Sequence, residues 1–311
     1  MIKQTFCLGL FLALQLPAHA QEAIRAVYQQ LHQGNVEGAY QQFRAIADRD
    51  PQSLAASFGV LIALYERGLQ DPALQKEFEH GIDRLIKNAS DRYEKNNRDT
   101  DALFYLEQGY LNRARYRGEF DKGIWGAARD GVKAKRYGDE YIKLDPGRAD
   151  GYFAVGLYNY YIEILPTFVK LLKTLLFMPG GNRAEGLKQI ERAAASNEPG
   201  APFAQDILID VYATENRFAD AVRVAENQHK KYPENASFRF SLAGIYPHSQ
   251  VENFDGAAQQ YTTIIQRLDQ NHPNYKPEQR YQATMNLAWL RAQQFRYEDA
   301  ITLLHPAIDS N

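Results

Sequence analysis

The chain has 311 residues, and its 36 Lys and Arg nearly balance its 38 Asp and Glu, which leaves a formal net charge of −2 at pH 7. Such a small charge argues against a general polyanion-binding protein, so we expect no nucleic acid partner. The length suffices for one long or two ordinary domains with a hydrophobic core. The only cysteine, Cys7, can form no disulfide within the chain.

Residues 1–20 have the features of a secretory signal peptide. They contain one cation, Lys3, then an apolar run over residues 6–16, and small residues at Ala18 and Ala20. The apolar run is shorter than the roughly 20 residues that a membrane-spanning helix needs, so a retained anchor is the weaker alternative. We expect cleavage after Ala20 and a periplasmic or secreted bacterial protein. The mature chain would contain no cysteine, and its packed core alone would have to stabilise it.

A small residue recurs along the rest of the chain, with a bulky apolar residue three positions before most occurrences and another apolar residue four positions after several. The small residues are Ala39, Ala73, Gly123, Gly186, Ala221, Ala257 and Ala300. Offsets of three and four place these side chains on one helical face, where the small residue lets a neighbouring helix approach closely. Each unit therefore predicts one helix of an antiparallel helical hairpin.

The helix before each turn has a pattern of its own. Three such helices have apolar residues at equivalent positions. These are Leu208 and Tyr212 in one helix, Leu242 and Tyr246 in a second, and Val155 in a third. They fit the aromatic-x2-Leu-Gly-x2-Tyr pattern of the tetratricopeptide repeat (TPR), and the small-residue units fit its A-x3-F positions. The chain therefore resembles the TPR family over essentially all of its mature length.

This resemblance implies an all-α fold, a right-handed superhelix of about six to seven helical hairpins that form a single solenoid over residues 21–311. Segments 21–53, 202–235 and 236–270 match best. The small residues are unevenly spaced, which predicts insertions between residues 88 and 186 that lengthen helices or add loops. A series of unrelated helical hairpins would show the same periodicity and stays open as an alternative.

A basic stretch extends from residue 113 to residue 136. Its cations are Arg113, Arg115, Arg117, Lys122, Arg129, Lys133, Lys135 and Arg136. They fit an acidic partner or anionic lipid headgroups, but acidic residues such as Glu119, Asp130 and Asp139 are interspersed among them. We therefore favour a solvated helix face.

A second irregular segment covers residues 163–186, where we expect an inserted apolar helix over residues 166–178. At about 1.5 Å per residue, this helix is too short to cross a bilayer. It must be covered either by the solenoid itself or by a partner or membrane surface. The nearby stretches "GLYNYYIEILP" and "GNRAEGL" resemble those of a group of exported bacterial TPR proteins.

The sequence contains no recognisable catalytic motif. It lacks H-E-x-x-H, paired cysteines, G-x-S-x-G and a dinucleotide-binding fingerprint. No two of its histidines are three or four residues apart, as a metal-binding pair on one helix would require. We therefore expect a protein that is not an enzyme and that binds neither a cofactor nor a metal.

The TPR resemblance implies that the first helix of each hairpin lines a concave groove, and that this groove binds a peptide or protein. The matching groove positions are Phe153, Tyr160, Tyr161, Asp206, Asp210, Phe240, His248, Met285 and Trp289. They would make the groove aromatic and mildly acidic. The favoured hypothesis is a non-enzymatic scaffold of the bacterial cell envelope that binds a segment of another envelope protein.

Two other functions stay open. A small-molecule or glycan receptor would use Tyr152, Tyr160, Tyr161 and Trp289 as stacking surfaces, although TPR cores also need aromatic residues. A peripheral membrane assembly factor would attach through residues 166–178. The last repeat has no evident polar capping helix, so weak self-association is a further expectation.

Overall fold

The computed structural model describes residues 18–69, 71–121, 123–164, 179–248 and 250–308. Within these residues the fold is all-α, with fourteen α-helices, one π-helical turn (Arg117–Asp121) and no strand. The α-helices are α1 (Ala18–His32), α2 (Val36–Arg49), α3 (Leu54–Arg67), α4 (Pro72–Lys95), α5 (Thr100–Tyr116), α6 (Ile124–Leu144), α7 (Tyr152–Ile164), α9 (Arg183–Ala194), α10 (Ala201–Thr214), α11 (Phe218–Lys231), α12 (Ala236–Ile245), α13 (Phe254–Asp269), α14 (Gln279–Gln293) and α15 (Tyr297–Ile308).

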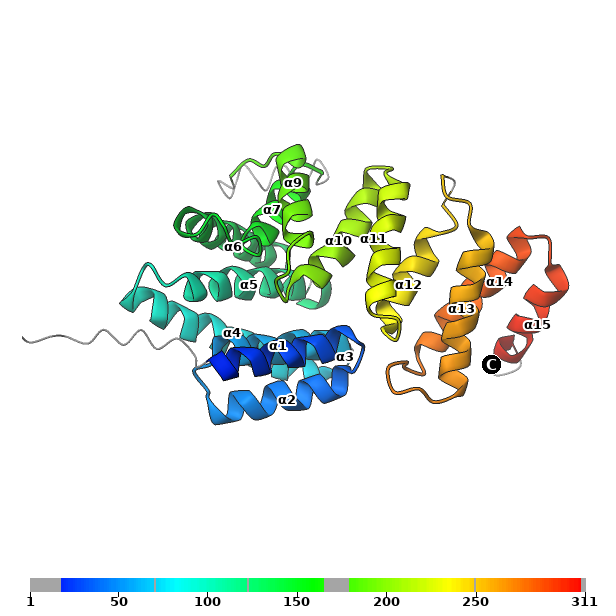
Figure 1. Cartoon of the computed structure of the whole chain (residues 1–311), viewed down its shortest axis with the longest axis horizontal. Coiled ribbons are helices and arrows are strands. Elements are labelled where there is room, and N and C mark those ends of the chain that lie inside the picture. The colour runs from blue at the N-terminus through cyan, green and yellow to red at the C-terminus, as the bar shows by residue number, and fades with distance from the viewer. Residues whose placement is uncertain (1–17, 70, 122, 165–178, 249, 309–311) are drawn as a thin grey trace, which may run out of the picture.

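Neighbouring helices pack in pairs along the chain. The described pairs are α1–α2, α3–α4, α5–α6, α7–α9, α10–α11, α12–α13 and α14–α15, and each hairpin also packs on the next. Figure 1 shows this order as a progression from the blue hairpins to the red one. The predicted all-α solenoid of about six to seven hairpins is confirmed.

Short polar side chains begin many of the helices. Each of these side chains accepts a hydrogen bond from a backbone N–H in the first turn of the helix that follows. The residues are Asn35, Ser53, Asp71, Asp99, Asn182, Asn235 and Asn253. Each such cap stabilises its helix by about 1 kcal/mol, because it satisfies an N–H that has no partner within the helix. Local sequence therefore decides where these helices start.

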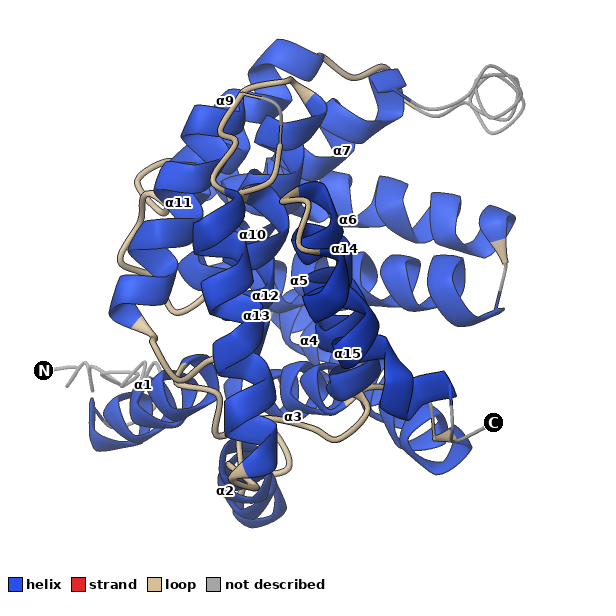
Figure 2. Ribbon diagram, turned by 90° about the vertical axis from the view of Figure 1, so that its right-hand side faces the viewer, coloured by secondary structure: helices blue, strands red, loops and turns tan. Residues whose placement is uncertain are grey.

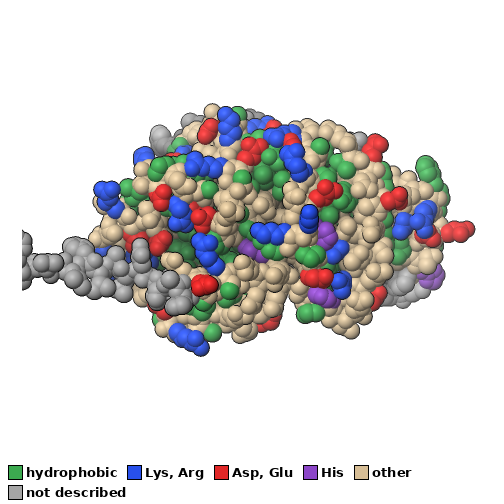
Figure 3. All heavy atoms as spheres, in the orientation of Figure 1, with side chains coloured by type: hydrophobic (Ala, Val, Ile, Leu, Met, Phe, Trp, Pro, Cys, Tyr) green, Lys and Arg blue, Asp and Glu red, His purple; other side chains and the backbone are tan. Residues whose placement is uncertain are grey.

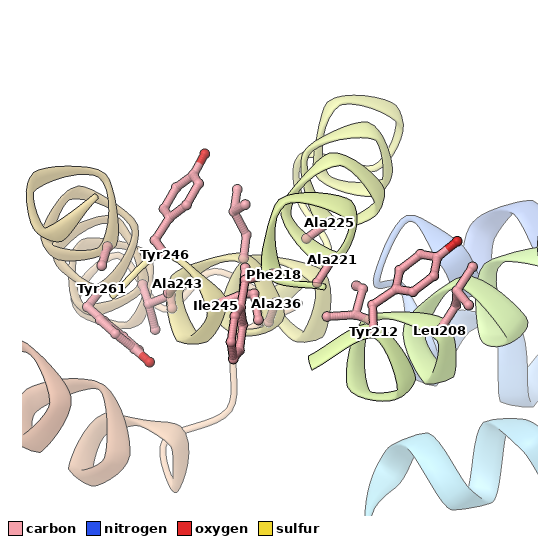
Figure 4. Close-up of a cluster of buried hydrophobic side chains, with 14 of the residues drawn as sticks. Leu208, Tyr212, Phe218, Ala221, Ala225, Ala236, Ala243, Ile245, Tyr246 and Tyr261 are labelled. Atoms are coloured by element: carbon pink, nitrogen blue, oxygen red, sulfur yellow. The ribbon is translucent and has the colours of Figure 1, made fainter. Parts of the chain in front are cut away.

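The small residues of the repeat lie at helix contacts in most hairpins. Ala39, Ala221 and Ala257 are fully buried, and Gly186 is buried beside the backbone of α7. Figure 4 shows the corresponding cluster around α10–α13, where alanines alternate with larger side chains such as Tyr212. These positions of the repeat are confirmed.

Two of the aligned small residues do not make such contacts. Ala73 is exposed in the first turn of α4, and Gly123 precedes α6. The close approaches fall later, at Gly81 and Gly138, where a Cβ atom would lie 2.8 Å and 2.5 Å from side chains of α3 and α7. The reason is helix length: α4 has 24 residues and α6 has 21, so their contact points are displaced along the helix.

The region between residues 88 and 186 was predicted to be irregular, and part of it is described by the structure. The α6 helix and the π-helical turn before it lie between residues 88 and 186, where insertions were predicted to lengthen helices or add loops. The predicted apolar helix over residues 166–178 lies outside the described residues. Most of the predicted signal peptide also lies outside them, and α1 begins at Ala18.

One carboxyl group is fully buried at the junction of three helices. Glu107 of α5 has no exposed surface, and its Oε1 accepts a hydrogen bond (3.2 Å) from the backbone N–H of Ala154 in the first turn of α7. Burial raises the pKa of Glu107 well above its ordinary value, and the negative charges of Asp150 and Asp139 raise it further. Glu107 therefore caps α7 from another helix and favours its neutral form.

We expect Glu107→Gln to unfold less readily than the unchanged protein at pH 8, by roughly 1–3 kcal/mol. The folded protein binds its proton above the ordinary glutamate pKa, so stability falls as pH rises from about 4.5 towards the raised folded pKa. Urea unfolding between pH 4.5 and 8 should show a difference that grows with pH. Parallel curves for the two proteins would contradict this explanation. Glu107→Ala is the control. It should be less stable than the unchanged protein at every pH, because removing the side chain leaves a cavity.

Candidate functional site

The concave face of the solenoid contains a large cavity. It has a volume of about 960 Å³, and residues of α1, α3, α5, α7 and α10 line it together with loops between the hairpins. Viewed along the long axis of the molecule, the hairpins wind around this face (Figure 2). The cavity is lined by residues that belong to, or pack on, both hydrophobic core clusters of the protein.

Apolar side chains four residues apart form much of the cavity wall. The pairs are Phe58 and Ile62 on α3, Phe153 and Leu157 on α7, and Phe203 and Ile207 on α10. Residues four apart share a helical face, so each helix presents a two-residue apolar stripe to the cavity. This aromatic-x3-aliphatic pattern recurs in the sequence and would have pointed to Phe58, Ile62, Phe203 and Ile207, which the groove prediction missed.

Arginines line the edge of the cavity and are paired with carboxylates. Arg92 binds Asp99 at 2.8 Å, and Arg148 binds Asp150 at 2.7 Å. Arg148 also lies 3.6 Å from Glu198. The Arg92–Asp99 pair joins the end of α4 to the start of α5, and the Arg148–Glu198 contact joins the loop after α6 to the loop after α9. The paired charges largely cancel one another.

Two further carboxylates line the same cavity from different helices, Glu66 at the end of α3 and Asp206 in the middle of α10. Burial raises the pKa of Glu66, and the carboxylate of Asp206 raises it further. Burial also raises the pKa of Asp206, with an opposing contribution from the hydroxyl of Ser241, which donates a 3.1 Å hydrogen bond. Within the described residues neither carboxylate forms an ion pair.

Contacts between the start of the chain and its second half lie next to the cavity, which Pro199 lines. Nε2 of His32 lies 2.9 Å from the carbonyl oxygen of Pro199, and the Asn235 amide donates to the carbonyl of His32 at 2.9 Å. The Asn274 amide donates to the carbonyl of Gln33 at 2.9 Å. The turn after α1 is therefore bound to three different segments, and Figure 1 shows the first hairpin beneath α10.

Gly34 allows this close approach. Its φ of +92° lies in the region that favours glycine, and a Cβ atom there would lie 2.9 Å from the Asn274 amide and 3.0 Å from the carbonyl oxygen of Glu234. Any larger residue would both strain the turn and push it away from the second half of the protein.

A second contact joins the end of α3 to the loop before α14. The ammonium of Lys276 donates to the carbonyl oxygens of Glu66 and Arg67, at 2.8 and 2.9 Å. The last carbonyls of a helix have no partner within it and carry its negative dipole end, so a cation satisfies them well. This contact fixes Glu66 at the cavity.

Only two of the predicted groove residues, Phe153 and Asp206, line the large cavity. Asp210 lies one helical turn beyond Asp206 and is exposed. Tyr160 is fully buried in the core of the second half, so its predicted place in the groove is wrong. It points inward because α7 packs closely on Gly186 of α9, while the neighbouring Tyr161 remains 39% exposed.

The four remaining groove predictions lie on the C-terminal hairpins. His248 stacks on Phe218 at 4.3 Å and, with Trp289, lines a smaller hollow of about 340 Å³. Met285 and Trp289 are 38% and 51% exposed, whereas Phe240 is half-buried beside Tyr261. The nine predicted residues thus occupy different surfaces and do not form one continuous groove.

Tyr152 was a candidate stacking surface for a glycan. The Arg192 guanidinium already lies over its ring, 3.8 Å from the centroid, and its hydroxyl donates to the carbonyl of Pro146 at 3.2 Å. One face of this ring is therefore occupied within the protein.

The basic stretch forms ion pairs with the carboxylates interspersed in it. Arg113 and Arg117 both bind Asp130, and Arg115 binds Glu119. Figure 3 shows the same mixture on one face of the molecule, with Lys and Arg beside Asp and Glu. Asp130 is buried, so its pairs with Arg113 and Arg117 belong to the interior, whereas the Arg115–Glu119 pair lies on the surface. The expected solvated face therefore holds for only part of this stretch.

The described residues offer no other obvious chemistry. Among them, no group of three or more His, Cys, Asp and Glu could hold a metal ion. No helix that the structure describes is both long and apolar enough to span a membrane.

No protein-family model matches the sequence, and no curated protein is significantly similar to it. Among solved structures, a thermophilic TPR protein from Thermus thermophilus is 15% identical over 73% of this chain and 99% of its own, with a TM-score of 0.45. A TPR protein from Parabacteroides merdae is 11% identical over 93% of this chain and 92% of its own, with a TM-score of 0.39. Yeast Tom70 is 13% identical over 92% and 83% of the two chains, with a TM-score of 0.33. The architecture itself follows from the helix contacts of this chain.

The contacts of His32 with the second half of the chain should weaken in acid. This side chain is buried, which lowers its pKa from 6.5 to about 4, so the folded protein keeps it neutral. The unfolded chain takes up the proton first, and about 3 kcal/mol of stability should be lost as pH falls from about 6.5 to about 4. His32→Gln removes the titrating ring but keeps a donor for Pro199, so its urea unfolding should depend less on pH in this range. An unchanged pH dependence would refute this role of His32.

Proposed function

We propose that this protein is a non-catalytic scaffold of the bacterial cell envelope, and that its central cavity holds a segment of another envelope protein. The cavity carries the proposal, because several successive hairpins contribute residues to this one hollow. Its volume of about 960 Å³ is at the upper end of the roughly 300–1,000 Å³ of typical ligand sites.

The chemistry of the walls suits a polypeptide segment. The apolar pairs on α3, α7 and α10 can receive the side chains of a bound segment, and the amides of Gln108 and Asn112 also line the cavity. A mainly apolar wall with a few polar groups is the usual composition of a binding site. Because the surrounding ion pairs already hold the loops, little further ordering is needed when the segment binds.

A small-molecule ligand is the second candidate. The walls of α1, α3, α5, α7 and α10 enclose part of the cavity, and such a partly enclosed hollow can also hold a compact ligand. The aromatic side chains in the wall would then provide stacking surfaces. Native mass spectrometry of the purified protein, which would show a retained ligand as added mass, separates this candidate from a protein partner.

A tryptophan that fills the cavity tests the proposed site. Ile207→Trp places a larger ring in the wall of α10, and we expect it to prevent capture of the partner segment after crosslinking in an envelope extract. The matched control is Asn227→Trp on the exposed outer face of α11, which should capture the partner normally. The partner would be identified by mass spectrometry and tested again in purified form. Equal capture by both variants would show that binding does not use the cavity.

The envelope location depends on the predicted signal peptide of residues 1–20. We expect the protein in bacteria to fractionate with the periplasm or the culture medium, and N-terminal sequencing to begin at Gln21. A chain that starts at Met1 and stays in the cytoplasmic fraction would refute the location while leaving the cavity proposal intact.

A further inference from the structure

The charged groups that line the cavity indicate which charge the bound segment carries. This inference rests on the proposed function. The lining contains seven carboxylates and four guanidinium groups and, among the described residues, no lysine or histidine. The carboxylates are Asp50, Glu66, Asp99, Asp101, Asp150, Glu198 and Asp206; the cations are Arg25, Arg92, Arg115 and Arg148. The lining therefore has an excess of three negative charges when all groups are ionised.

The four arginines are already neutralised within the protein. Arg92 and Arg148 bind Asp99 and Asp150. Arg25 lies 3.7 Å from Glu198, and Arg115 binds Glu119 at 3.0 Å while its guanidinium lies over the ring of Tyr65. The excess negative charge therefore resides on carboxylates that have no cation of their own.

Among the lining carboxylates that have no paired cation, burial raises the pKa of Glu66 and of Asp206. They come from different helices, α3 and α10, and line one cavity without an ion pair among the described residues. An apolar side chain precedes each by about one helical turn, Ile62 before Glu66 and Phe203 before Asp206, and both also line the cavity. An acidic end next to an apolar wall complements a cation on an apolar stem.

We propose that the bound segment inserts a lysine or arginine side chain into the cavity, with its charged group between Glu66 and Asp206 and its stem against Ile62 and Phe203. Both carboxylates are half-buried and lack a paired cation, so they lose part of their hydration without compensation. A cation from the partner would offset that cost for both carboxylates at once. A free organic amine has the same chemistry, and competition with n-butylamine separates it from a polypeptide.

Charged and polar groups from several elements surround the pair. Arg115 of α5 and Lys276 of the loop before α14 lower the pKa of Glu66, while Asp206 raises it. Asp210 raises the pKa of Asp206, and Ser241 of α12 lowers it. The pKa of each group nevertheless stays raised, so the two neighbouring cations do not replace a direct partner. Binding of a cation should lower both pKa values and should therefore strengthen as pH rises through the raised pKa values of the two carboxyl groups.

Three hexapeptide pools test the proposal. They are identical mixtures except for one fixed position, which is lysine, norleucine or glutamate. We expect the purified protein to retain the lysine pool about tenfold better than the norleucine pool, and the glutamate pool least. The lysine preference should be larger at pH 8 than at pH 5. n-Butylamine, which carries the lysine head group without a backbone, should compete only weakly.

Substitutions test whether Glu66 and Asp206 cause the preference for lysine peptides. Glu66→Gln and Asp206→Asn should each reduce the lysine preference severalfold, and the double variant should remove it while still retaining norleucine peptides. Asp101→Asn is the matched control, because it removes one charge from the exposed edge of the same cavity and should leave the preference largely intact.

The outcomes separate this inference from the proposed function. Equal retention of the lysine and norleucine pools would overturn the cationic side chain but keep the cavity as a segment-binding site. Retention of no pool would overturn both. Binding of n-butylamine as tight as that of the lysine peptides would replace the polypeptide with a small amine.

Discussion

One contact joins the two ends of the solenoid around the candidate site, the docking of the turn after α1 onto the second half of the chain. Asn235 and Asn274 reach the carbonyls of that turn, and Gly34 leaves the space for them. Asn235 also caps α12, so the same side chain starts a helix and binds the turn after α1. Together with the ion pair between Arg25 and Glu198, this contact holds the first hairpin against the second half of the chain.

Partial enclosure changes what the cavity can bind. On an open surface, charged side chains are hydrated and interact weakly, whereas in a partly enclosed cavity an unpaired charge loses part of its hydration. The arginines at the edge are paired, but Glu66 and Asp206 are not. A protein that keeps such groups unpaired gives up stability there, and binding sites are where such exceptions to good packing are expected. The cavity that holds these carboxylates is lined by residues from helices of several successive hairpins.

The sequence predicted the local features of the fold well and the site only partly. The hairpins were predictable because the spacing of Ala221 or Ala257 to its neighbours repeats within one or two helical turns. Ala73 and Gly123 were misplaced, because longer helices move the contact point and the spacing alone does not show by how much. Phe153 and Asp206 were placed at the cavity, whereas Tyr160 was not separated from the core. Both faces of α7 are apolar, so periodicity does not say which faces inward.

The sequence by itself determined the helix starts, the order of the hairpins and the absence of recognisable catalytic motifs, because caps and periodicity act over a few residues. Only the tertiary structure decided that the turn after α1 docks onto the second half of the chain and which carboxylates are left unpaired in the cavity. The docking hydrogen bonds join residues 167, 203 and 241 positions apart, and no local pattern in a chain records pairs at that distance. Such contacts follow from the accumulated curvature of all the hairpins between them, which depends on how each pair of helices packs.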